Sequence, residues 1–128
     1  GGLAMDKTEI EEMFAGLGPV VAKRMFGGQG VYHHGLIVAI VYQGEVLLKA
    51  DEQTHPLFEA AGARRWVYDG HEGKTTAMPY WSIPDSAYDD PDEMAAWTRR
   101  AYEAALRAPP KPPPRRTARG AGKPKTRR

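Results

Sequence analysis

Three glycines within four positions, Gly27, Gly28 and Gly30, separate two apolar stretches and restrict the possible folds of this chain more than any other feature. A glycine loop that binds phosphate leads directly into a helix, whose N-terminal N–H groups face the anion. Here the following residues, 31–42, are mostly β-branched, aromatic or aliphatic and are broken by one turn. The glycines are therefore expected to serve a β-bulge or a tight strand-to-strand crossing rather than a nucleotide loop.

The first half of the chain predicts one helix followed by four strands. Asp6 and Glu9 have the spacing of a capping box, and apolar residues recur at helical intervals up to Leu17. Gly18 is expected to end this helix in the left-handed conformation. Turn residues and short links then make neighbouring strands antiparallel. The strands are expected near 22–27, 30–33, 36–42 and 45–50.

The second half predicts a helix over 51–62, strands near 64–68 and 75–81, and a final helix that begins at Asp90-Pro91. The fold class expected is therefore α+β: a two-layer antiparallel sheet of five or six strands with N-terminal, middle and C-terminal helices. The inward stripe of the final helix is expected to consist of Met94, Trp97, Thr98, Ala101, Tyr102 and Ala105.

The segment 36–42 has an entirely apolar interior, which is typical of a central strand covered on both faces. Three helices leave part of such a sheet poorly covered. A homodimer with contacts that involve this segment is therefore predicted.

Charge divides the chain into two parts, a domain over 5–108 and a Pro-rich basic tail over 109–128 that is expected to be disordered. The tail has eight basic residues and no acid, which leaves ten basic against 16 acidic residues in the body. The body thus carries about −6, so attraction to nucleic acid should reside in the tail. The candidate nucleic-acid-binding residues are Lys111, Arg115, Arg116, Arg119, Lys123, Lys125, Arg127 and Arg128.

Two alternatives for the tail remain open beside non-specific nucleic-acid binding. One is association with an anionic membrane surface or another polyanion, and the other is a solubilising end with no partner. No apolar run approaches the ~20 residues that span a bilayer, so a soluble, cytoplasmic protein is expected.

The sequence offers little for catalysis, and no catalytic, cofactor-binding or metal-binding residue is predicted. The chain has no cysteine, which excludes thiolate chemistry and cysteine-ligated metals. Three of the four histidines, His33, His34, His55 and His71, fall in predicted turns or loops, and exposed turn histidines are a better interpretation than a metal site. Adjacent His33 and His34 are expected to point to opposite faces of a strand. The protein is therefore expected not to be an enzyme.

The aromatic residues are expected to pack in the core or in a dimer interface. On a strand, Trp66 and Tyr68 share one face, whereas Tyr80 and Trp81 diverge. The competing hypothesis is a small ligand-binding or enzymatic domain with a pocket between the sheet and the final helix, lined by Tyr80, Trp81 and Trp97.

An ordered set of motifs resembles the N-terminal domain of the TfoX/Sxy competence-regulator family over about residues 5–106. Its first motif is Met25, Phe26, Gly27, Gly28, Gly30 and Tyr32, followed by a hairpin with Gly35. Later matches are Phe58, Gly62, the strand 66–68, the run 78–81, Trp97 and Ala101.

The resemblance implies a compact two-layer domain in a bacterial regulatory or interaction protein that is related to competence or transcription. We expect this domain to form the homodimer and to bind a protein partner whose identity the sequence does not give. Longer family members add a C-terminal helical domain, and here the basic tail stands in its place. The domain is therefore expected to act alone, with the tail adding non-specific nucleic-acid affinity.

Overall fold

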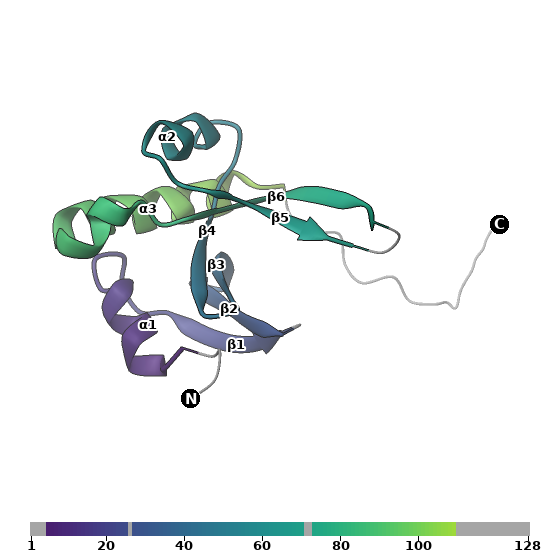
Figure 1. Ribbon diagram of the computed structural model, residues 1–128. Helices are drawn as coiled ribbons and strands as arrows, with labels where there is room; N and C mark the ends of the chain where they lie inside the picture. The colour runs from purple at the N-terminus through teal and green to yellow at the C-terminus, as the bar shows by residue number, and fades with distance from the viewer. Residues whose placement is uncertain (1–4, 26, 71–72, 110–128) are drawn as a thin grey trace.

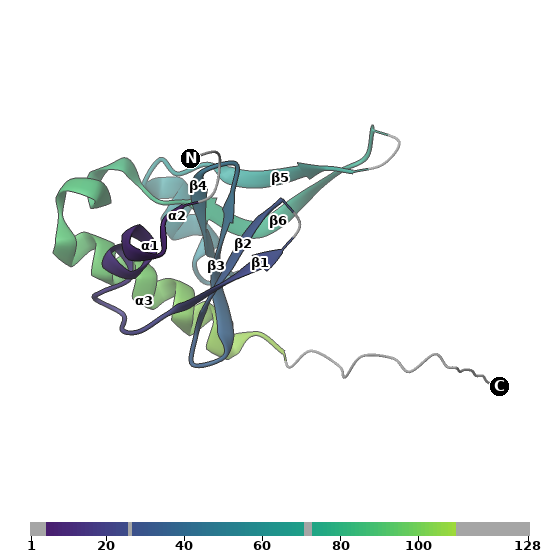
Figure 2. The same cartoon turned by 90° about the horizontal axis from the view of Figure 1, so that it is seen from below.

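The computed structural model describes residues 5–25, 27–70 and 73–109. Its architecture is α+β, as the sequence predicts, with three α-helices on one side of a six-stranded antiparallel sheet (Figures 1 and 2). The elements in chain order are α1 (Lys7–Met13), β1 (Val21–Met25), β2 (Gly28–His33), β3 (Leu36–Tyr42), β4 (Glu45–Lys49), α2 (His55–Ala60), β5 (Arg65–Asp69), β6 (Thr75–Ser82), η2 (Asp85–Asp89) and α3 (Pro91–Arg107).

The first helix begins as predicted and ends earlier. The capping box forms at its start, where the Asp6 N–H donates to Glu9 Oε1 at 3.2 Å. The expected end at Gly18 was wrong, because Phe14 already leaves the helical conformation and buries its ring completely in the core. Gly18 has a positive φ of 132°, outside the left-handed helical region, and its N–H donates to the Phe14 carbonyl at 3.0 Å.

All six strands form one sheet in the order β1-β2-β3-β4-β6-β5, and each neighbouring pair is antiparallel. Consecutive hairpins join the first four strands. β6 then lies between β4 and β5, but only Tyr80, Trp81 and Ser82 of β6 pair with β4 in the described register. The Pro79 carbonyl still accepts from the Ala50 N–H at 2.8 Å. Before Pro79, β6 pairs with β5 alone, so these two strands extend beyond the sheet as a two-stranded arm (Figure 1).

The glycine motif lies where β2 meets β3. Gly27 adopts a φ of 65° in the turn between β1 and β2. A Cβ added to Gly28 would overlap the carbonyl oxygen of Val41 and lie 3.4 Å from the Cα of Tyr42. A strand follows the glycines and no helix does, so the interpretation as a close strand approach is confirmed.

A β-bulge in β3 decides which residues face the helices. Val31 of β2 pairs with Ala39, whereas the next residue, Tyr32, pairs with Ile37. Val38 is therefore the extra residue of the bulge, and both Val38 and Ala39 belong to the core on the helix side.

The main core lies between the sheet and the helices (Figure 2). Phe58 of α2 is fully buried at its centre, with ring centroids 4.6 Å from Trp97 of α3 and 5.9 Å from Trp81 of β6. Ile10 and Phe14 add the contribution of α1. The three helices therefore share one core and cover one face of the sheet.

The final helix begins as predicted, because the Asp90 carboxylate accepts the N–H groups of Asp92 at 3.0 Å and Glu93 at 3.2 Å. Two features here were not predicted: the short helix η2, and the buried Ala104 beside the expected stripe. Of the expected stripe, Trp97, Thr98, Ala101 and Ala105 are buried, whereas Met94 and Tyr102 are half-buried.

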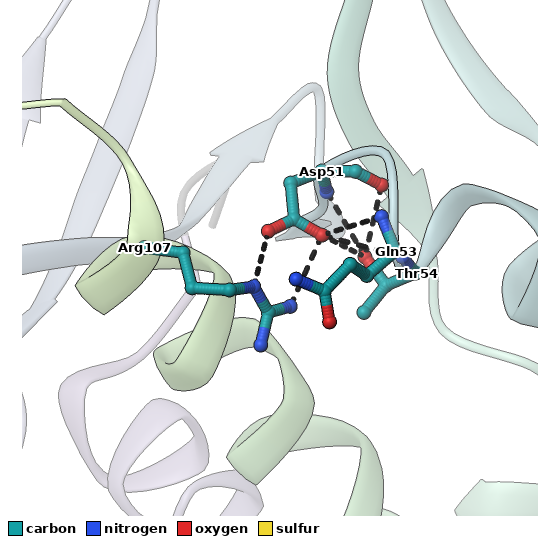
Figure 3. Close-up of polar contacts among 4 residues, drawn as sticks. All are labelled: Asp51, Gln53, Thr54 and Arg107. Carbon is teal, nitrogen blue, oxygen red and sulfur yellow. Dashed lines mark hydrogen bonds and ion pairs between the residues drawn. The ribbon is translucent and has the colours of Figure 1, made fainter.

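An ion pair joins Asp51, two residues after β4, to Arg107 in the last turn of α3 (Figure 3). Arg107 Nε donates to Asp51 Oδ2 at 2.7 Å and its Nη2 donates to Oδ1 at 3.1 Å. The same Oδ1 accepts the N–H groups of Gln53 at 3.0 Å and Thr54 at 3.2 Å, which form a turn before α2. α2 is therefore shorter than the predicted 51–62. The hydrogen bond from Arg107 holds the pKa of Asp51 below its usual value, against a smaller opposing effect of burial.

In the part of the chain that the structure describes, no helix is long and apolar enough to cross a membrane.

Candidate functional site

The sheet face opposite the helices carries a second apolar cluster, built by strands alone. Ile40, Leu47 and Tyr80 are buried there although no helix of the described residues covers them. Partly buried side chains surround these three residues. They are Ile37, Tyr42, Trp66 and Met78.

Strand alternation explains which residues reach this face. Met78 and Tyr80 of β6 point to it, whereas Trp81 points into the helix-side core. In β3 the bulge shifts the alternation, so that Ile37 and Ile40 share the open face. The entirely apolar 36–42 segment is thus explained: four of its residues serve the core and three, Ile37, Ile40 and Tyr42, serve the open face.

Four aromatic rings form one end of the open face. The Trp66 ring centroid lies 5.3 Å from that of Tyr42, 5.9 Å from Tyr68 and 6.2 Å from Tyr80. Tilted and edge-on pairs at these distances attract each other beyond their area of contact. Trp66 and Tyr68 share one face, as the sequence predicts, and the rings make a preformed aromatic surface.

These rings line a groove of about 710 Å³. Its volume falls in the range of roughly 300–1,000 Å³ typical of ligand pockets. One end of the groove is closed by the C-terminal end of α3, where Ala105, Ala108 and Pro109 line it. The remaining lining residues are Met25, Gly28, Gln29, Tyr32, Gly35, Leu36, Ile37, Ile40, Val41, Tyr42, Lys49, Trp66, Tyr68, Met78 and Tyr80.

Among the described residues that line the groove, only Lys49 is charged. Its Nζ lies 5.4 Å from the centroid of the Tyr80 ring, within reach of a cation–π interaction. Burial raises the pKa of Tyr80, and the neighbouring Tyr32 adds to this effect, so its hydroxyl remains protonated at neutral pH. The groove therefore offers apolar and aromatic contacts, and its described lining residues include no set of groups suited to proton transfer.

Two acidic residues lie beyond the aromatic end of the groove. Glu45 and Asp69 line an adjoining depression together with Tyr42, Trp66 and Tyr68. Glu45 Oε2 accepts from Arg64 Nη2 at 2.6 Å, so Arg64 compensates its charge, and Asp69 is exposed. Asp69 is therefore the acid at this end to which a cationic ligand would be attracted.

The residues of the glycine motif lie along one side of the groove. Met25, Gly28, Tyr32 and Gly35 line it, and Gly30 packs against the Tyr32 ring. Phe26 lies outside the described residues, as do all eight basic residues proposed for nucleic-acid binding, Lys111 to Arg128.

The pocket expected between the sheet and the final helix is not found at the three aromatic residues named for it. Trp81 and Trp97 pack around Phe58 and fill this space, with only 7% and 6% of their surfaces exposed. Tyr80 lines the groove on the opposite face. The expected location was wrong because one residue of a strand cannot share a face with its neighbour.

The histidines differ from the prediction in two ways. His33 is buried, and its Nδ1–H donates to the Pro19 carbonyl at 2.6 Å. The His33 and His34 rings do not diverge but stack at 3.9 Å, because His34 has left the strand with a φ of 51°. His55 is half-buried at the start of α2, where its Nδ1 accepts from Trp81 Nε1 at 2.8 Å, and His71 lies outside the described residues.

No group of three or more His, Cys, Asp or Glu side chains suited to a metal ion occurs in residues 5–25, 27–70 and 73–109. Sequence reasoning anticipated the apolar strand but missed the groove, because Met78 and the end of α3 reach it only through the folded topology. The available signal was the run of apolar residues on both phases of 36–42.

The family model described as TfoX N-terminal domain matches residues 12–105. The match begins within α1, ends two residues before the end of α3, and includes all six strands. No curated protein is similar enough to this chain to count as a match.

Proposed function

Because the chain belongs to the TfoX N-terminal domain family, we propose that it is a non-enzymatic regulatory protein that binds another protein through its aromatic groove. The family supports a regulatory or interaction role in general. The observation that carries the specific proposal is the open sheet face, where Trp66 and four tyrosines line a groove that α3 borders at one end only.

The chemistry of the groove favours a peptide with apolar side chains. Tyrosine and tryptophan provide large, rigid contact areas and are enriched where proteins bind each other. A contiguous apolar patch on a soluble domain typically marks an interaction site. We propose that this binding regulates competence or transcription in the bacterial cytoplasm.

The test is selection of binding peptides from a random library against the full chain. We expect the selected peptides to lose at least about tenfold in affinity, or about 1.4 kcal/mol, when Tyr42→Ala or Tyr68→Ala removes a ring from the groove. The control is Leu57→Ala, which removes an exposed apolar side chain from α2 on the helix side. Peptides that bind the groove variants and the wild type equally would refute the proposal.

We propose in addition that the tail gives non-specific affinity for nucleic acid. This proposal is supported by the distribution of charge, because the tail carries eight basic residues and the body is acidic. Eight phosphate contacts would give a slope of log affinity against log salt of about −7. A gel-shift experiment compares the full chain with a chain truncated after Ala108, and equal binding at low salt would exclude the tail.

A homodimer is a second proposal for the open face. Of the segment 36–42, Ile37 and Tyr42 are only partly buried on this face, and a second copy could bury them. Size-exclusion chromatography with light scattering should then show a mass that rises with concentration from 14.1 kDa towards twice that value. A mass that stays near 14 kDa at all micromolar concentrations contradicts a dimer.

The alternative of a small-ligand-binding domain is supported by the volume of the groove on the open face. The pocket first expected between the sheet and α3 does not support it. Thermal-shift screening against metabolites and nucleotides tests it, because a ligand that binds only the folded state raises its melting temperature.

A further inference from the structure

We propose that the chain's own proline-rich segment, residues 109–114, docks in the groove as a polyproline II helix and that a partner must displace it. The docking depends on the geometry of the groove and the sequence of the segment. Its regulatory consequence rests on the proposed function of the groove as a binding surface.

The first support is the place where the described chain ends. Ala105, Ala108 and Pro109 all line the groove, so α3 delivers the chain to the rim of the groove without a linker. A segment tethered so close has a high effective concentration, of the order of millimolar for short flexible tethers. A free partner has to compete with this local concentration.

The second support is chemical complementarity. The segment has the sequence Pro-Pro-Lys-Pro-Pro-Pro, and proline-rich segments dock in grooves lined by aromatic residues because their extended helix is preformed. The groove presents Trp66 within about 6 Å of Tyr42, Tyr68 and Tyr80. This is the kind of surface that such a helix requires.

The period of the helix separates its prolines from its charge. With three residues per turn, Pro109 and Pro112 share one edge, and Pro110 and Pro113 share a second edge. Lys111 falls on the third edge. Two all-proline edges can therefore face the groove while Lys111 points to solvent, away from Lys49 on the Tyr80 ring.

The dimensions also agree. Six residues of polyproline II span about 19 Å at ~3.1 Å per residue, and the seven residues of β3 span about 20 Å at ~3.3 Å per residue. A segment that starts at the Leu36 end of the groove thus reaches the Tyr42 end. The next two residues, Arg115 and Arg116, then arrive beside Asp69, whereas the neighbouring Glu45 is paired with Arg64.

Paramagnetic NMR on the full chain tests the docking. The chain has no cysteine, so Thr117→Cys provides a single site for a nitroxide label. We expect the label to broaden the backbone amide signals of Tyr42 and Trp66. The broadening should weaken clearly in a P110G/P112G/P113G variant, which keeps the length and charge of the tail but leaves the label on a flexible tether with a reach of about 16 Å. It should stay unchanged in the control Pro124→Gly.

Each outcome decides the proposal. Absent broadening, or equal broadening in the triple-glycine variant, overturns it. Broadening of an unlabelled ¹⁵N chain mixed with nitroxide-labelled chains also overturns it, because a second copy would then fill the groove.

Peptide binding separates this proposal from the proposed function. If docking and the proposed function both hold, library peptides bind the triple-glycine variant several-fold more tightly than the wild type. Peptides that bind both chains equally overturn the docking and leave the proposed function intact. Broadening without any groove-binding peptide supports the docking while the proposed function fails.

Discussion

Replacement of Gly28 by alanine tests whether the glycine motif exists for close strand packing. The new Cβ would overlap the Val41 carbonyl oxygen and lie 3.1 Å from the Val41 carbonyl carbon, so backbone and not a flexible side chain must move. Overpacking costs about 1–3 kcal/mol, and each backbone hydrogen bond lost as β2 and β3 separate adds about 1 kcal/mol. Alanine offsets about 0.4–1 kcal/mol by restricting the unfolded chain.

The net effect expected of Gly28→Ala is a loss of about 2 kcal/mol or more, which lowers the melting temperature of a domain of this size by roughly 8–16 °C. Urea and thermal unfolding of the full chain, followed by tryptophan fluorescence, measure it. The matched control is Gly30→Ala, whose Cβ would meet the ends of the Tyr32 and Met25 side chains at 3.0 and 3.1 Å. These side chains can turn away, so a small change is expected. Equal losses in the two variants would refute the packing argument.

Three further predictions concern the core and two ionisable contacts. Burial, aided by Arg65, lowers the pKa of His55, so the free energy of unfolding should fall as the pH drops below about 6.5. Urea midpoints measured at about pH 7.5 and 5.5 should show a smaller fall in His55→Asn than in the wild type. Arg107 lowers the pKa of Asp51, so the ion pair stabilises the fold above about pH 4 and this stabilisation is lost as the pH falls through the lowered pKa. In Arg107→Gln the free energy of unfolding should therefore depend less on pH in this range. Phe58→Ala should cost about 3–5 kcal/mol in urea unfolding, because its ring is fully buried.

Local sequence rules predicted the elements that depend on neighbouring residues. The capping box at Asp6, the proline start of α3 and the turns between the strands are decided within four or five residues, and the structure has them as expected. α1 was predicted too long because burial of the Phe14 ring in the core depends on residues far away in the sequence. The stacking of His33 and His34 also escaped prediction, since it depends on a positive φ at a non-glycine residue.

The groove was the least predictable part of the molecule. The apolar 36–42 strand indicated a second apolar face, but periodicity does not reveal a bulge, and the bulge at Val38 decides which residues face outwards. The contribution of Pro109 depends on where α3 ends in space. Such long-range placement is not encoded in any short segment of sequence.

Because of the two-stranded arm, one side of the groove is rigid and the other side is flexible. Trp66, Tyr68 and Met78 belong to strands that extend past the last pairing with β4, whereas Ile37 and Ile40 sit in the middle of the sheet. Isolated pairs of strands are only marginally stable, so backbone amides of the arm should exchange with deuterium faster than those of β3. By flexing this arm, the domain can narrow its cleft around a slim ligand and widen it for a bulkier one.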